Sequence, residues 1–324
     1  MTTSHGRRRL HLAAALDRPS VYDAGAYLAA ARLAELGALD FVTLDDCLAR
    51  PGPDAPSVLA RVAPVTRRVG LVPTLTTTHT EPFRVQAAVA TLDWVSRGRA
   101  GWRIGVSTTE GEARLFGRRP AASADVLWRE AGEAADVAAR LWDSRETVPR
   151  PPQGHPVRVV DASAGPARAV AARYADVALV RTAHPERAAA ARADLRASAA
   201  AHGRDPDGLR VLAALDIDLG AGEYAAHPGH GGGGPRPTPR GPLYRGGPVD
   251  LAELIARWHR EGTVDGFHLT PVEPDRDLER LVNGTVPLLQ HRGLFRTFYP
   301  GSTLRDHLGL ARPANRYAVA RGVS

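Results

Sequence analysis

Side chains that could bind or ionise gather in four short stretches rich in hydroxyl groups and small residues. They are Asp45-Asp46, a threonine-rich run from Thr74 to Thr80 that contains His79, Ser107 to Thr109, and Asp161 to Gly165. Hydroxyls and backbone N–H groups at helix starts can orient a phosphate and a polyol chain, whereas hydrolysis would need paired carboxylates or a metal ion. The stretches therefore favour binding of a phosphorylated ligand over hydrolytic chemistry.

Each stretch also has a purely structural interpretation. Threonines at the end of a strand often only cap the next helix, and Asp45 or Asp46 could do the same. His79 is the candidate for proton transfer, although a histidine in such a place more commonly makes a local hydrogen bond. Taken singly, the stretches leave both interpretations open.

Other catalytic classes find little support. His227 and His230 lie in a glycine-rich segment without a third ligand nearby, which is weak support for zinc, and we expect no metal site. A nucleophilic serine would need a Gly-x-Ser-x-Gly turn, which the sequence lacks. Cys47 is the single cysteine and has no cationic neighbour, so neither a disulfide nor a reactive thiolate is expected, and a reducing cytoplasm fits.

Composition and charge limit the class of protein. The 324 residues are 44% apolar and 24% charged, which suits a globular protein with a sizeable core. All 42 basic residues are arginines, set against 35 acidic ones, and apart from Arg7 to Arg9 they form no basic run longer than two. We therefore expect no nucleic-acid surface. The apolar stretch Leu10 to Leu16 is too short for a signal peptide, and no apolar run of about 18 residues predicts a membrane span.

Short apolar runs alternate with amphipathic stretches along the chain. Eight runs read as strands covered on both faces, and stretches typical of helices separate them. The predicted strands are 10–16, 41–44, 69–74, 100–106, 157–160, 177–180, 209–217 and 266–269. The predicted helices are 22–36, 56–63, 82–96, 123–142, 165–174, 185–202, 249–261 and 277–291. Eight such pairs predict an α/β fold, a closed (β/α)₈ TIM barrel over residues 1–324 as one domain.

The barrel interpretation places the four polar stretches together. They follow the second, third, fourth and fifth strands, and barrel enzymes build their sites at the carboxyl ends of strands. A doubly wound dinucleotide fold is disfavoured because no strand is followed by a Gly-x-Gly-x-x-Gly turn.

One segment breaks the alternation. Gly220 to Pro248 is rich in glycine and proline, has almost no aliphatic side chains, and follows the seventh strand. Such a composition predicts a flexible insertion, because it buries too little surface to offset the cost of ordering. It could act as a lid over the site or have no role.

Three segments, together with two near the carboxyl terminus, carry a family resemblance. They are Leu39 to Asp46, Thr74 to Phe83, Thr91 to Trp102, Arg292 to Thr297 and Leu304 to Leu310. They resemble the bacterial luciferase-like, flavin-dependent monooxygenases, in the branch that includes nitrilotriacetate monooxygenase and dibenzothiophene-sulfone monooxygenase. The similarity covers most of the chain outside the glycine- and proline-rich segment.

The resemblance implies a cofactor and partners. It implies reduced FMN bound in the barrel mouth, delivered by a separate NAD(P)H-dependent flavin reductase, and O₂ used to oxygenate a small organic substrate. It also implies a homo-oligomer. We expect the carboxyl-terminal tail, from Gly293 to Tyr317 and on to residue 324, to pack on the barrel exterior or on a neighbouring subunit.

The resemblance also assigns residues. Asp45 matches an acidic or polar residue near the flavin, and Thr74 with Thr76 matches flavin contacts of the third strand. Ser107 and Thr108 match a polar pair after the fourth strand. The phosphate cup that follows the fifth strand in the family survives in shortened form. Its remaining residues are Ser163 and Gly165.

This sequence departs from the family pattern at three further places. Arg103 stands where the family commonly has a flavin-contacting asparagine, Gly117 to Trp128 lacks the usual histidine and tyrosine, and a substrate-side insertion is cut to residues 143–154. An arginine at position 103 could pair with phosphate or with the electron-rich edge of a flavin. Two alternatives therefore remain: a deazaflavin-dependent oxidoreductase of the same fold, and a degenerate barrel that binds a ligand without turnover.

Overall fold

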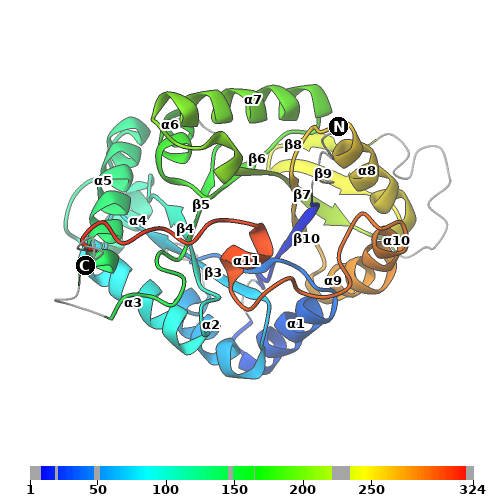
Figure 1. The fold of residues 1–324 in the computed structure, drawn as a ribbon, viewed down its shortest axis with the longest axis horizontal. Helices are drawn as coiled ribbons and strands as arrows, with labels where there is room; N and C mark the ends of the chain where they lie inside the picture. The colour runs from blue at the N-terminus through cyan, green and yellow to red at the C-terminus, as the bar shows by residue number, and fades with distance from the viewer. Residues whose placement is uncertain are drawn as a thin grey trace, which may run out of the picture.

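The computed structural model describes residues 9–18, 21–46, 52–144, 149–163, 165–220 and 234–318. Within them, ten strands form one sheet, and β7 pairs with both β6 and β10, so that β1 to β7 and β10 close into a parallel barrel. Figure 1 shows the helices arranged around this barrel. The strands are β1 His11–Ala15, β2 Phe41–Leu44, β3 Gly70–Thr76, β4 Gly101–Gly105, β5 Val157–Asp161, β6 Val177–Val180, β7 Arg210–Asp218, β8 Arg236–Thr238, β9 Gly241–Arg245 and β10 Gly266–Pro271.

The helices lie where the sequence predicts them, with two additions. They are α1 Ala24–Leu36, α2 Ala55–Val62, α3 Pro82–Val95, α4 Glu110–Phe116, α5 Ala124–Asp143, α6 Gly165–Tyr174, α7 Pro185–Ala201, α8 Pro248–Arg260, α9 Pro274–Arg280, α10 Val286–His291 and α11 Leu304–Leu308. A π-helical turn joins α9 to α10, so the predicted last helix is one irregular helix. The addition on the barrel wall is α4, which Thr109 caps by accepting a hydrogen bond from the backbone N–H of Glu112.

Side chains alternate between the inside and the outside of the barrel. Phe41, Val72, Val159, Leu179 and Leu212 belong to one buried cluster, inside the ring of strands. Their neighbours in sequence, such as Val42, Leu71 and Val160, belong to a second and larger cluster under the helices. This period of two means that the direction of each strand residue can be assigned from its register. The barrel prediction is confirmed.

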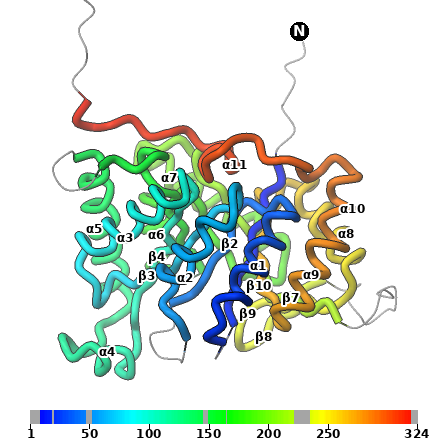
Figure 2. The backbone as a smooth tube through the Cα atoms, turned by 90° about the horizontal axis from the view of Figure 1, so that it is seen from below, coloured from blue at the N-terminus to red at the C-terminus, as the bar shows by residue number. Residues whose placement is uncertain are grey.

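The carboxyl-terminal tail corrects one expectation. Instead of packing on the outside of the barrel, it crosses the amino-terminal end of the barrel, and Leu304 and Leu308 of α11 join the inner cluster (Figures 1 and 2). Arg305 holds α11 in place by donating to the backbone carbonyl of His155 at 2.7 Å and to Asp176 at 3.2 Å. The tail therefore closes the amino-terminal end of the barrel.

The glycine- and proline-rich segment is also more ordered than its composition suggests. Within Gly220 to Pro248, β8 and β9 form an antiparallel hairpin, and β9 pairs with β7 at Asp216 to Asp218, beyond the end of β6. Tyr244 of β9 is fully buried, which stabilises the hairpin. The prediction of a wholly flexible insertion is wrong for residues 236–245. Positions 221–233, with His227 and His230, lie outside the described residues, as does Cys47.

Candidate functional site at the carboxyl ends of the strands

Inward-facing positions near the carboxyl ends of the strands form a polar layer. Thr74 of β3 and Arg103 of β4 are paired in register, two residues beyond the apolar Val72 and Gly101. The same alternation brings in polar residues from other strands. They are Thr43 of β2, Asp161 of β5, Arg181 after β6, Asp216 of β7 and His268 of β10. The barrel is thus apolar towards α11 and polar towards the opposite mouth.

Two arginines share one carboxylate in this layer. The Arg181 Nε atom donates to Asp161 Oδ2 at 2.8 Å, and Arg103 Nη2 lies 3.8 Å from the same oxygen. Ser163 donates its hydroxyl to Asp161 Oδ1 at 2.5 Å. Burial alone would raise the pKa of Asp161, but Arg181, Ser163 and Arg103 together lower it. Asp161 therefore stays ionised, and the cluster has one more positive than negative charge.

A buried histidine faces this cluster from the other side of the barrel. His268 is 1% exposed, and its Nε2 atom lies 2.9 Å from the hydroxyl of Thr43. Burial, Arg103 and Arg181 lower the pKa of His268 to about 3, so it is neutral at physiological pH. Its Nδ1 atom is buried and finds no hydrogen-bond partner among the described residues.

Residues assigned from the resemblance fall into two groups. Thr74, Thr76 and Arg103 face into the barrel, and Asp45 follows β2 with its backbone N–H donating to Asp17 Oδ1 at 2.7 Å. Ser107 instead donates its hydroxyl to Glu112 at 2.7 Å, next to the capped start of α4.

The remaining assigned residues lie on the rim. Thr108 is exposed. The hydroxyl of Ser163 is occupied by Asp161 and also accepts from the backbone N–H of Arg181. Gly165 begins α6 and has open space where a side chain would stand. The register thus brings together the residues of β3 and β4, while the hydroxyls that follow β4 and β5 largely serve local caps and turns.

His79 lies on the rim between β3 and α4. Its ring stacks on Phe116 at 4.4 Å with an 8° angle between the planes, and it is 7% exposed. Neither ring nitrogen has a hydrogen-bond partner among the described residues, so the alternative of a local hydrogen bond is wrong. Burial and the neighbouring Arg119 lower its pKa and keep it neutral.

Sequence reasoning missed Arg181 and His268, and it named Asp161 without giving it a role. The alternation of side chains along a strand could have identified them, because each of the three stands an even number of residues after an inward-facing position of its own strand. A charged or polar side chain at such a position must face the barrel interior. What this alternation could not show is which strands bring their side chains into contact.

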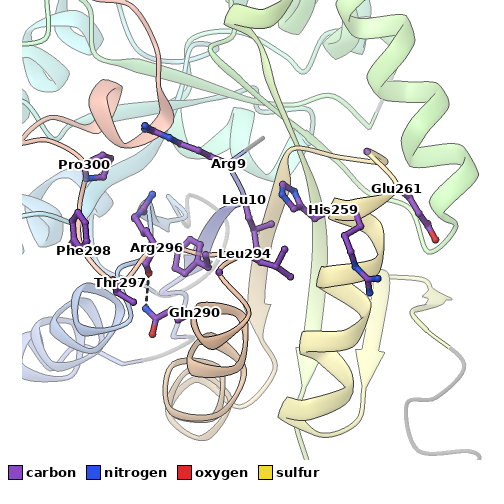
Figure 3. Close-up of a pocket in the computed structure, with 14 residues that line it drawn as sticks. Arg9, Leu10, His259, Glu261, Gln290, Leu294, Arg296, Thr297, Phe298 and Pro300 are labelled. Carbon is purple, nitrogen blue, oxygen red and sulfur yellow. Dashed lines mark hydrogen bonds between the residues drawn. The ribbon is translucent and has the colours of Figure 1, made fainter. Parts of the chain in front are cut away.

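A separate hollow of about 960 Å³ lies at the opposite end of the barrel (Figure 3). Arg9 and Leu10, just before β1, line it together with the end of α8 at His259 and the segment around Phe298. Because it adjoins the amino ends of the strands, it has no connection with the polar layer of the mouth. Among the described residues, we find no group of acidic, histidine or cysteine side chains suited to a metal ion, and no helix long and apolar enough to cross a bilayer.

The fold is a (β/α)₈ barrel with a candidate ligand site at the carboxyl ends of its strands. Residues 5–228 match the luciferase-like monooxygenase family, and the chain belongs to it. Component A of nitrilotriacetate monooxygenase from Aminobacter aminovorans is 29% identical over 412 aligned positions, which cover 90% of this chain and 91% of that protein. Dibenzothiophene-sulfone monooxygenase from Rhodococcus erythropolis is 26% identical, with 79% of each chain covered. Both bear out the predicted branch.

Solved structures show the same fold. The EDTA monooxygenase of Chelativorans sp. BNC1 superposes with a TM-score of 0.81 at 21% identity, covering 94% of this chain and 99% of that one. Luciferase-like monooxygenases are flavin-dependent, so the mouth can be tested for its fit to a flavin.

The described residues fit a flavin in two respects. Thr74 Oγ1 is buried without a hydrogen-bond partner among the described residues, and the guanidinium of Arg103 beside it can supply several N–H donors. Gly105, the next inward position after Arg103, presents no side chain and packs closely on Thr74, since an added Cβ would lie 3.2 Å from Thr74 Cγ2. Unused donors beside a position without a side chain suit a ring that carries carbonyl acceptors.

Proposed function

We propose that this chain is a flavin-dependent monooxygenase that uses reduced FMN and O₂ to oxygenate a small organic substrate. The observation that carries the proposal is the pair Thr74 and Arg103 at the barrel mouth. The buried hydroxyl of Thr74 has no hydrogen-bond partner among the described residues, and the partly buried guanidinium of Arg103 beside it has only a 3.8 Å contact with Asp161. When bound, reduced flavin supplies two electrons, so that one oxygen atom enters the substrate and the other leaves as water.

The chain's own residues bind and enclose the reacting groups. Thr74, Thr76 and Arg103 hold the ring system, and Asp45 lies at the neighbouring strand end. The start of α6 at Gly165 offers backbone N–H groups and the positive end of the helix dipole to the phosphate, next to Ser163. Ser107 and Thr108 border the same mouth on the β4 side.

His79 is the candidate for proton transfer in this proposal. Its neutral imidazole can accept or donate a proton at a ring nitrogen, and stacking on Phe116 fixes the plane of the ring. A separate NAD(P)H-dependent reductase supplies the reduced flavin, and the chain works as a homo-oligomer.

The deciding experiment is an anaerobic titration of the purified protein with FMN reduced by dithionite, followed by fluorescence or absorbance. We expect saturable binding. After a flavin reductase, NADH and ¹⁸O₂ are added, we expect substrate-dependent incorporation of one labelled oxygen. No saturable binding of reduced FMN would overturn the proposal. Binding of a reduced deazaflavin instead would favour the deazaflavin-dependent oxidoreductase, and binding of neither cofactor would favour the degenerate barrel.

A further inference from the structure

The guanidinium group of Arg103 is partly buried and has unused donors. Its side chain is 15% exposed, and its contact with a carboxylate is the distant one to Asp161 at 3.8 Å, which is too long for a hydrogen bond. No hydrogen bond joins Arg103's guanidinium to any other described residue. Arg99 shows how this fold treats an arginine that has only a structural role, since its guanidinium makes five hydrogen bonds to Ser96, Thr66, Val69 and Ala63.

Thr74 repeats the same deficiency on the adjacent strand. It stands opposite Arg103 in the parallel register and is 9% exposed, and its hydroxyl has no partner among the described residues. A buried polar group that finds no partner costs about 1–3 kcal/mol. The hydroxyl of Thr74, beside the unused N–H donors of Arg103, therefore indicates a place for the polar atoms of a ligand.

The charges around this place favour a ligand with a negative charge. Asp161 is already held by Arg181 at 2.8 Å and by Ser163 at 2.5 Å, so it neutralises Arg103 only weakly. His268 faces the same space as a neutral ring, and burial raises the pKa of Asp216 against the influence of Arg181 and Arg240. Arg103 is thus the guanidinium of this layer that is free to meet an anion at short range.

The proposed cofactor changes charge at one edge of its ring. Two-electron reduction of a flavin yields a form that loses the proton from N1 and holds the negative charge over N1 and the C2 oxygen, whereas the oxidised ring is neutral. A guanidinium donates two parallel N–H groups to two adjacent acceptors, and protein charge near N1 is a recognised means of tuning a flavin.

Resting on the proposed function, we propose that Arg103, together with Thr74, binds the anionic N1 and C2-oxygen edge of the reduced flavin and thereby makes the site prefer reduced over oxidised flavin. Phosphate is the other anion the cofactor carries. Moving the phosphate from water into the layer around Arg103 costs more free energy than moving the singly charged ring edge there. The exposed backbone N–H groups at the start of α6, at Gly165 on the rim, can bind the phosphate instead.

The test measures dissociation constants for reduced and oxidised forms of both FMN and riboflavin, which lacks the phosphate. The variants are Arg103→Gln, which removes the charge, Arg103→Lys, which keeps it, and Arg140→Gln on the exposed face of α5 as the matched control. We expect Arg103→Gln to reduce the preference for the reduced form at least tenfold with both flavins. For a two-electron couple, that lowers the midpoint potential of the bound flavin by about 30 mV. Arg103→Lys should restore part of the preference, and Arg140→Gln should match the parent.

Other outcomes separate the possible failures. If Arg103→Gln weakens binding of FMN but not of riboflavin, Arg103 contacts the phosphate and the inference is wrong. An equal loss for reduced and oxidised forms would also overturn it, because the residue would then only shape the site. If the parent protein binds no flavin, the proposed function fails as well, whereas a preference unchanged in a folded Arg103→Gln variant removes only this inference. Thermal unfolding of each variant shows that the fold is retained.

Discussion

Leu304 of α11 occupies the space that a side chain on Gly70 of β3 would need. A Cβ atom at position 70 would lie 2.6 Å from Leu304 Cδ1 and 2.8 Å from the Cβ atom of Phe41. Gly70, the first residue of β3, therefore packs directly against α11, which lies near the carboxyl terminus. Their fit closes the end of the barrel opposite the polar mouth.

The plug can be tested by a double-mutant cycle. Leu304→Ala should lower the free energy of unfolding by about 2–5 kcal/mol, because it leaves a cavity in the inner core. Gly70→Ala should cost about 1–3 kcal/mol through overpacking. In the double variant the small side chain at 304 makes room for the one at 70, so the combined cost should be smaller than the sum. Denaturant unfolding of the four proteins measures this, and strict additivity would contradict the direct contact.

Two inward-facing threonines of the mouth should respond in opposite ways to loss of the hydroxyl. Thr43→Val leaves His268 Nε2 without its 2.9 Å partner and should destabilise the protein by about 1–3 kcal/mol. Thr74→Val removes a hydroxyl that has no partner among the described residues, so stability should stay equal or rise.

Thr74→Val should weaken flavin binding even though it does not lower the stability of the protein. A net hydrogen bond of about 1 kcal/mol corresponds to roughly fivefold weaker binding of reduced FMN by Thr74→Val. Unfolding curves and the anaerobic titration give the two readouts. A Thr74→Val variant that is destabilised yet binds the flavin normally would show that the hydroxyl has a structural role.

Acidification should destabilise the fold through three buried histidines. Burial lowers the pKa of His155 to about 4, that of His268 to about 3 and that of His307 to about 4. Below the ordinary value of about 6.5, the unfolded chain binds protons that the folded histidines do not, so stability falls as pH falls from about 6.5 to about 4.

Asp93 acts in the opposite direction. Burial raises its pKa to about 6, so the folded state binds a proton that the unfolded state lacks between pH 6 and about 4. Asp46 acts in the same way, because burial and the neighbouring Asp54 and Asp45 raise its pKa to about 6. Three protons against two leave a slope of at most roughly 1.4 kcal/mol per pH unit. Urea unfolding at pH 7.5, 6 and 5 measures the slope, which His307→Asn should reduce by about one proton. Stability that is flat or rises on acidification would contradict the neutral state of these histidines.

The stacking partner of His79 should control its protonation. Removing Phe116, which lies 4.4 Å away, admits water to one face of the imidazole, so Phe116→Ala should raise the pKa of His79 towards its ordinary value. An NMR titration of the imidazole resonances measures the change. Phe298→Ala, at an exposed position of the opposite end, is the control and should leave the titration unchanged. An unchanged His79 pKa in Phe116→Ala would place the cause in Arg119.

The sequence by itself determined the barrel and the strand ends at which the candidate site lies. Apolar runs such as Val177 to Val180 are strands because both faces are covered, and their number predicts closure. The same patterns place Thr74, Arg103 and Asp161 at strand ends, so the candidate mouth follows from local information. Their inward direction also follows, since side chains on a strand alternate.

Only the tertiary structure decided which of these residues meet and which are already occupied. His268 and Thr43 are 225 residues apart in sequence and touch because closure brings β10 near β2, and no local pattern contains that distance. The same holds for the tail that enters the barrel at Leu304, and for the hairpin that Tyr244 anchors beside β7. A hydroxyl such as that of Ser163 looks available in the sequence and is occupied in the fold, because a hydrogen bond depends on atoms brought within about 3 Å by the whole chain.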